Sequence, residues 1–222
     1  MTPPLRTPTA PAMALRTALI LLIFVVAFTS LLAAAYLWTR PAIEAAAAAE
    51  KMKLIDEVLP PDLYDNELLA DSRRLAPAVG LGLEEESTAY LARKGGRVSA
   101  VVFEAVAADG YSGRIRLLLA VAADGTLLGV RVTQHKETPG LGDYIEPRKD
   151  RNRERPWIRQ FDGLSLAAVG DREWRVRKDG GRFDSVVGAT VTPRAVIRAV
   201  HRALHWVAEN RQQLFALDGA AK

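Results

Sequence analysis

The chain of 222 residues contains no cysteine. Disulfide bridges are therefore excluded, and cysteine usage does not indicate the cellular compartment. Iron–sulfur clusters are held chiefly by cysteine thiolates, so we expect none in this protein. If the protein transfers electrons, an organic cofactor must carry them.

The chain also lacks a strong excess of one charge. There are 30 Lys and Arg residues against 26 Asp and Glu residues, which leaves a net charge of +4. The basic stretch 148–159 is interrupted by Asp150 and Glu154, and we interpret it as a solvated loop. No basic stripe with interleaved aromatic residues occurs, so nucleic acid is not expected as a partner.

Histidine is scarce, and nucleotide-binding glycine motifs are incomplete. His201 and His205 are two of only three histidines, and Arg202 stands between them where a zinc protease has glutamate. We interpret the pair as exposed histidines of a helix, and we expect neither a metal site nor a catalytic residue. The Gly-Leu-Gly runs at 80–82 and 140–142 lack the third glycine of a dinucleotide fingerprint.

One long apolar run is present near the N-terminus. Residues 17–39 carry no charge over 23 positions, between Arg16 and Arg40. A helix of that length spans about 35 Å, enough for a hydrocarbon core of about 30 Å. The alternative is a signal peptide cleaved near 33–35, but the apolar part of a signal peptide has only about 7–15 residues. We therefore predict a transmembrane helix preceded by a short cytoplasmic tail, residues 1–16.

The rest of the chain divides into a linker and a domain. Residues 40–61 are predicted to form a helical linker, because alanine favours helix and Pro60 and Pro61 would end it. Residues 62–222 are enough for one domain with its own core. Within that domain, the acidic segment 62–86 is interpreted as connecting structure.

The domain is predicted to be α+β, an antiparallel sheet packed with helices. Runs rich in β-branched residues are separated by turns at 110–113 and at Asp124-Gly125, and the second turn predicts a hairpin. Residues 156–161 are typical of a short helix that buries its two aromatic residues. The predicted strands are 97–106, 114–122, 126–134 and 173–178.

The segment after residue 190 predicts an amphipathic helix. Thr192 suits the N-cap, and Pro193 suits the first helical position, where its missing N–H is not needed. The apolar residues that follow recur at i, i+4, i+7, i+8 and i+11, so they share one face. They are Val196, Val200, Ala203, Leu204 and Val207.

Two loops are candidates for one binding site. Gly188-Ala189-Thr190 precedes the helix, so the Thr190 hydroxyl would lie beside a helix N-terminus, where unpaired N–H groups favour a phosphate. The loop 135–143 offers a carboxylate, an imidazole and closely approachable glycine backbone, which suits a flat heteroaromatic cofactor. The alternatives are a simple strand–turn–helix corner at Gly188 and a solvated pair of His135 and Glu137.

Taken together, these segments resemble the G subunit of the Rnf (or Rsx) electron-transport complex. The same covalently flavinylated domain occurs in the C subunit of the sodium-pumping NADH:quinone reductase. The family's flavinylation motif reads Asp, two variable residues, Ser or Thr, Gly, Ala, Thr. Asp184, Gly188, Ala189 and Thr190 match it, whereas Val187 stands where Ser or Thr is usual.

The resemblance implies FMN joined through its phosphate to Thr190 Oγ as a phosphoester, installed by a separate flavin transferase that uses FAD and magnesium. It also implies electron relay through that FMN, in a membrane complex that couples electron transfer between ferredoxin and NAD to ion movement. The subunit would have no complete active site of its own. Further cofactor contacts are expected at Gly188, Ala189, Thr192, Glu137, Thr138, Gly140 and Leu141.

The partners implied by the resemblance are the other subunits of the complex, the flavin transferase and membrane lipid. The expected location is the cell inner membrane, crossed once, with the flavin domain on the periplasmic side. Two alternatives stay open. One is the equivalent subunit of the quinone reductase, and the other is a cofactor-free anchored module that serves only assembly.

Overall fold

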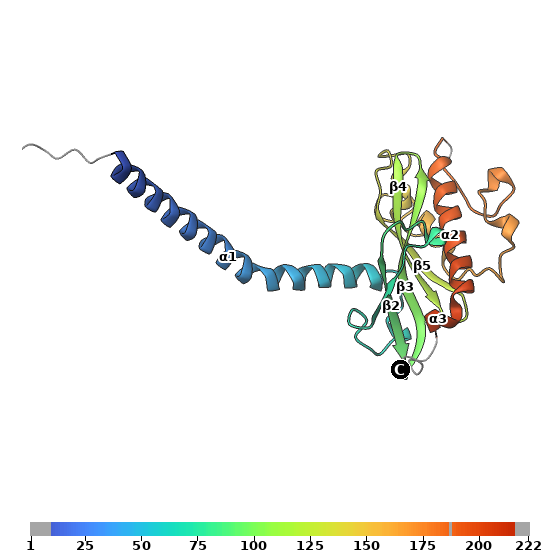
Figure 1. Cartoon of the computed structure of the whole chain (residues 1–222). Coiled ribbons are helices and arrows are strands. Elements are labelled where there is room, and N and C mark those ends of the chain that lie inside the picture. The colour runs from blue at the N-terminus through green and yellow to red at the C-terminus, as the bar shows by residue number, and fades with distance from the viewer. Residues whose placement is uncertain (1–9, 187, 216–222) are drawn as a thin grey trace, which may run out of the picture. The chain divides into compact units, whose positions relative to one another are not determined.

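The computed structural model describes residues 10–186 and 188–215 of the chain (Figure 1). Its contacts divide the chain into two units, Met1–Ala49 and Glu50–Lys222, each of which is described by itself. Val187, the departure from the flavinylation motif, lies outside the described residues.

Helix α1 (Ala10–Asp56) is one continuous helix of 47 residues that includes Pro41. Within the described residues, it is the one helix long and apolar enough to cross a membrane. Its large apolar side chains from Leu15 to Leu37 are exposed on all sides, as lipid contact requires. Residues 40–56 of the linker helix expected over 40–61 form the last part of α1, which ends at Asp56, before Pro60 and Pro61.

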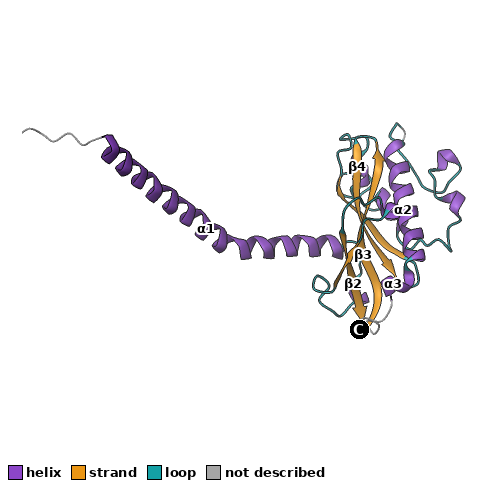
Figure 2. Cartoon of the chain, viewed as in Figure 1, coloured by secondary structure: helices purple, strands orange, loops and turns teal. Residues whose placement is uncertain are grey.

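The second unit is built on a five-stranded sheet with strand order β1-β2-β3-β4-β5, in which every neighbouring pair is antiparallel (Figure 2). The α+β prediction is thereby confirmed. Three predicted strands correspond to β3, β4 and β5, whereas β1 lies inside the segment that was expected only to connect. The strands are β1 (Ser72–Leu75), β2 (Ser87–Lys94), β3 (Arg97–Gly110), β4 (Gly113–Ala122) and β5 (Leu127–Gln134).

Both faces of the sheet are covered, so the middle of β3 is buried on both sides. Alternate residues such as Val101 and Phe103 face the larger core, which includes the apolar face of α2 (Val191–Glu209). The intervening Val102 faces a second cluster with Ile55 and Val58, from the end of α1 and the turn after it. All five residues of the predicted apolar face of α2 are buried, as expected.

The remaining elements are short. A helix over 156–161 was predicted and is present as the 3-10 helix η4, in which Trp157 and Phe161 are buried. Helix α3 (Arg211–Phe215) follows α2. The 3-10 helices are η1 (Pro61–Leu63), η2 (Val79–Leu81), η3 (Asp143–Ile145), η4 (Trp157–Phe161), η5 (Asp171–Glu173) and η6 (Arg177–Asp179).

The strand predicted over 173–178 is wrong. Residues there form η5, η6 and the turn between them, and a single isolated bridge joins Val176 to Phe183. The alternation that predicted a strand is present, because Trp174 and Val176 are buried while their neighbours are exposed. The backbone groups of this segment bond mainly to residues 181–183, as in the bond from the Arg177 N–H to the Phe183 carbonyl (2.8 Å), without forming a strand ladder.

Candidate functional site

A cavity of about 250 Å³ lies where three segments of the second unit meet. These are the β3–β4 turn, the loop after β5 and the start of α2. The structure brings together seven of the eight predicted site residues, and Gly140 is the one that does not line the cavity. The lining residues are Tyr111, Glu137, Thr138, Leu141, Gly142, Gly188, Ala189, Thr190, Val191 and Thr192.

Glu137 holds the three segments together. Its side chain is buried, and its Oε1 accepts a hydrogen bond from the Ser112 N–H in the β3–β4 turn (3.0 Å). Its Oε2 accepts a hydrogen bond from the Thr192 hydroxyl in the first turn of α2. A buried carboxylate requires such donors, so Glu137 is not the solvated loop residue considered from composition.

Two glycines leave the space that Glu137 occupies. A Cβ atom on Gly142 would lie 2.8 Å from Glu137 Oε2 and 2.9 Å from Thr192 Oγ1. A Cβ on Gly110 would lie 2.9 Å from Glu137 Oε1. Any larger residue at either position would push the carboxylate away from its donors, so these glycines serve close approach.

His135, which is not among the residues that line the cavity, bonds to the backbone of Glu137. The Glu137 N–H donates to His135 Nδ1 (2.9 Å), so the proton of a neutral His135 must be on Nε2. That nitrogen lies 2.6 Å from Glu146 Oε1 and donates to it. Burial raises the pKa of Glu146, but hydrogen bonds from Lys149 and His135 outweigh it and hold that pKa below its usual value.

Thr190 lies at the N-terminal end of α2. It occupies the N-cap position, with φ −96° and ψ −16°, and its side chain makes no capping hydrogen bond. The N-cap expected at Thr192 is therefore wrong by two residues, because the Thr192 hydroxyl is used by Glu137 instead. The N–H groups of Val191 and Thr192 have no carbonyl partner within the helix, as at any helix start. Within the described residues, a hydroxyl without a capping role and a positive helix end thus border the same cavity.

The turn before Thr190 is held by two buried aromatic residues. The Tyr144 hydroxyl donates to the Ala189 carbonyl (3.2 Å), and Trp157 Nε1 donates to the Asp184 carbonyl (2.5 Å). Gly188 has φ +88°, a conformation that favours glycine, and among the described residues other than its chain neighbours no atom lies within 4 Å of where its Cβ would be. The carbonyl groups of Asp184 and Ala189 are thereby held, and the described residues leave open space beside Gly188.

These groups fit a phosphate-bearing heteroaromatic ligand. A phosphate beside Thr190 would meet the N–H groups and the dipole of α2, a favourable term of about 0.3–1 kcal/mol. Tyr111 and Leu141 line the same cavity with large side chains that are more than half exposed, so they can cover a flat ring. Sequence reasoning placed Tyr111 in a turn and did not name it as a cofactor contact. An aromatic residue in a glycine turn was the signal that could have identified it.

Two family models match the chain. Residues 110–205 match the model described as FMN-binding domain, and residues 9–58 match the model described as RnfG N-terminal region. All ten residues that line the cavity fall within 110–205.

The chain is also similar to curated proteins that are named as the G subunit of an ion-translocating oxidoreductase complex. The protein of Pseudomonas aeruginosa (strain UCBPP-PA14) is 49% identical over 209 residues, which cover 93% of this chain and 94% of that protein. The protein of Vibrio atlanticus (strain LGP32) is 42% identical over 201 residues, 90% and 93% of the two chains. That of Shewanella baltica (strain OS223) is 38% identical over 203 residues, 91% and 93% of the two.

Proposed function

Because this chain belongs to the G-subunit family of the ion-translocating oxidoreductase (Rnf) complex, we propose that it relays electrons through an FMN carried in the cavity described above. FMN supplies one- or two-electron transfer when it is bound. The protein would hold the cofactor and set its surroundings, while the other subunits bind ferredoxin and NAD. One membrane-spanning helix by itself forms no ion pathway.

The attachment point in this proposal is Thr190, through a phosphoester between its Oγ1 and the FMN phosphate. In the reaction, the hydroxyl oxygen attacks the FMN phosphorus of FAD, AMP leaves and the hydroxyl proton is released. A separate flavin transferase would catalyse it with magnesium. The observation that carries the proposal is the Thr190 hydroxyl, which borders the cavity at a helix N-terminus without serving as a capping group.

The apolar helix and the family make this a single-pass membrane protein. We further propose that it lies in the inner membrane with Glu50–Lys222 on the periplasmic side. A covalent bond is useful there, because a cofactor lost outside the cytoplasm cannot be recaptured from a cellular pool. The quinone-reductase alternative has less support. The similar proteins are named as subunits of the ion-translocating complex, and this chain matches them over nearly their full length.

The proposal is tested by asking whether flavin is covalently attached to the protein. Full-length protein made together with the flavin transferase should show a fluorescent band on a denaturing gel. Peptide mapping should place the added mass of FMN, less one water, on the peptide that contains Thr190. Thr190→Val removes the attacking oxygen while keeping the shape of the side chain, so the band should disappear.

Thr138→Val is the matched control, because Thr138 also lines the cavity and loses the same hydroxyl. It should keep the fluorescent band. A fluorescent Thr190→Val band would show that another residue carries the flavin. A wild-type protein that carries no flavin, yet purifies with its partner subunits, would instead support the cofactor-free assembly module.

A further inference from the structure

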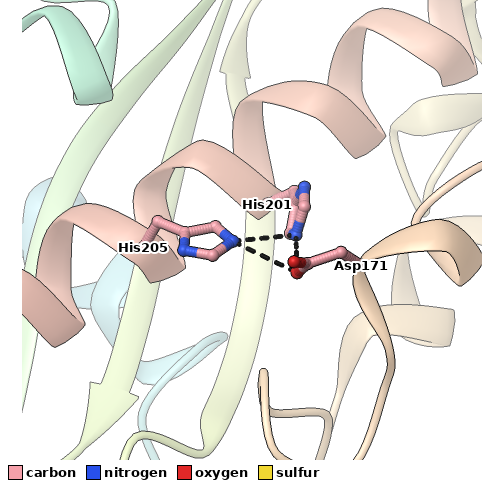
Figure 3. Close-up of side chains that lie close together, drawn as sticks. All are labelled: Asp171, His201 and His205. Carbon is pink, nitrogen blue, oxygen red and sulfur yellow. Dashed lines mark hydrogen bonds and ion pairs between the residues drawn. The ribbon is translucent and has the colours of Figure 1, made fainter.

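Three polar side chains converge on the outer side of α2, away from the cavity. His201 Nε2 lies 3.1 Å from Asp171 Oδ1 and 3.1 Å from His205 Nε2, and His205 Nε2 lies 3.3 Å from the same Asp171 oxygen. Figure 3 shows the two imidazole nitrogens and the carboxylate turned toward one another. We refer to Asp171, His201 and His205 as the His-His-Asp trio.

Hydrogen bonding alone does not account for this arrangement. A neutral imidazole with its proton on Nε2 can donate a hydrogen bond to Asp171. The three atoms form three close pairs, however, and one N–H group cannot provide the hydrogen for all of them. If only one histidine donates, the lone pair of the other faces the carboxylate oxygen. If both carry a proton on Nε2, two N–H groups face each other across 3.1 Å. A cation shared by all three atoms removes the conflict.

The distances suit a metal ion. Ligand atoms about 2.0–2.2 Å from a divalent first-row metal are separated by about 2.8–3.6 Å, the shorter values in octahedral and the longer ones in tetrahedral coordination. The three separations of 3.1, 3.1 and 3.3 Å fall inside that interval. A point about 2.1 Å from all three atoms therefore exists, about 1 Å off their plane. Two imidazoles and one carboxylate are ligands that zinc and other divalent first-row transition metals accept.

The fold holds the trio in place. His201 and His205 are one helical turn apart on α2, which sets them on the same face. The His201 ring stacks on Trp174, with ring centres 5.2 Å apart and planes 13° apart. Asp171 begins η5, and its side chain is 72% exposed, so an ion can enter from solvent and keep open positions for water.

We propose that Asp171, His201 and His205 bind a divalent transition-metal ion such as zinc, with water completing the coordination. The site is separate from the cavity, since His201 follows Thr190 by eleven residues, about 16 Å along the helix axis. An ion there links the segment that carries η5 to α2. Sequence reasoning set the histidine pair aside because Arg202 stands where a zinc protease has glutamate. Asp171 precedes His201 by 30 residues, so its nearness was not visible in the local spacing.

The experiment uses the full chain in detergent, without an affinity tag and after removal of metal by a chelator. Zinc binding is measured by calorimetry, and cobalt binding by visible absorption at wavelengths beyond the flavin bands. One equivalent of each metal is expected, with zinc displacing cobalt. Loss of a group that only orients a metal ligand costs about 10–100-fold in metal affinity, so His205→Gln, which removes a direct ligand, should weaken binding at least as much. His205 is half-exposed, so the variant should still fold.

Asp171→Asn should also weaken binding, and Asp179→Asn is its matched control. Asp179 lines the same groove beside α2 but pairs with Arg194 at 2.7 Å and belongs to no trio contact. Asp179→Asn should bind metal as the unchanged protein does. Absence of stoichiometric binding would overturn the proposal, as would unchanged affinity in His205→Gln. An equal loss in Asp179→Asn would show attraction by charge alone and would also overturn it.

Discussion

At the scale of single residues, one buried carboxylate organises the candidate flavin site. Glu137 joins the β3–β4 turn to the first turn of α2, and its own N–H is bonded to His135. Each charge-assisted hydrogen bond of this kind contributes about 1.5–3 kcal/mol. The geometry of the cavity therefore depends on residues that need not touch the cofactor, and the glycines around Glu137 are among them.

Gly142→Ala tests this dependence. The added Cβ would contact Glu137 and Thr192 at less than 3 Å, whereas the backbone at Gly142 (φ −97°) tolerates alanine. The overpacking should cost about 1–3 kcal/mol in the free energy of unfolding and should reduce flavin incorporation. Urea denaturation and in-gel fluorescence measure the two effects.

Gly170→Ala is the control for that substitution. Its Cβ would meet only Glu173 Oε1, at 3.6 Å, and its φ of −65° suits alanine. Its unfolding free energy should stay the same or rise by up to about 1 kcal/mol, because alanine restricts the unfolded chain, and its flavin content should be unchanged. If Gly142→Ala behaved in the same way, Glu137 would not require the close approach described here.

At the scale of elements, short 3-10 helices position the turn that leads into α2. Tyr144, in η3, bonds to the Ala189 carbonyl, and Trp157, in η4, bonds to the Asp184 carbonyl. The two rings pack edge to face with centres 5.7 Å apart. The loop that presents Thr190 is therefore fixed by neighbouring elements more than by its own sequence.

The Tyr144 contact predicts a pH dependence of stability. Burial raises the pKa of Tyr144 to about 12, from about 10 in an unfolded chain. The neutral hydroxyl stabilises the fold fully below pH 10, and this contribution is lost as the pH rises from about 10 to 12. Tyr144→Phe should cost about 1 kcal/mol at neutral pH. Each pKa unit corresponds to about 1.4 kcal/mol, more than the hydroxyl contributes at neutral pH. Urea denaturation across this pH range should therefore show the difference between the two proteins shrinking and then reversing in sign, and a constant difference would contradict the assignment.

The sequence predicted elements well where local pattern and tertiary environment agree. The apolar face of α2 and the strands β3 to β5 are examples, because burial follows their periodicity. The same reasoning failed at 173–178, where alternation buries Trp174 without any strand partner. Strand β1 has four residues of mixed polarity at the sheet edge, too few for a periodic signal.

The candidate site divides in a similar way. The position of Gly188 and Thr190 just before α2 was predictable, because glycine before a helix start is a local signal. The close approach of Gly142 to Glu137 was not predictable, nor was that of Asp171 to the histidine pair, since each involves a side chain that is near only in the folded chain. Spacing along the sequence cannot show such contacts.

At the scale of the whole molecule, the sheet is stabilised from two sides by parts from opposite ends of the chain. α2 covers one face, and Ile55, Val58 and Leu59 cover the other. The backbone of Val58 lies very close to Gly129 in β5. A Cβ atom on Gly129 would lie 2.9 Å from the Cα atom of Val58. The end of α1 and the turn that follows therefore belong to the folded domain as well as to the membrane connection.

Two shortened chains test this division. A chain that begins at Glu50 keeps all three apolar residues and should fold without detergent, with the stability of the full domain. A chain that begins at Pro61 loses them, at about 1.5–3 kcal/mol for each buried aliphatic side chain. Its urea midpoint should therefore be much lower. Equal midpoints would show that these residues contribute nothing to the domain.

The strand order β1-β2-β3-β4-β5 has a consequence for the timing of maturation. Every strand pairs with its neighbour along the chain, so the sheet requires only short-range loop closures, which favour rapid folding. The cavity is different, because it needs the β3–β4 turn, the loop after β5 and α2 in contact at once. In a chain that emerges N-terminus first, α2 arrives after the whole sheet. The hydroxyl that we propose as flavin acceptor is thus presented only by the completed domain, and attachment of the cofactor reports that folding has finished.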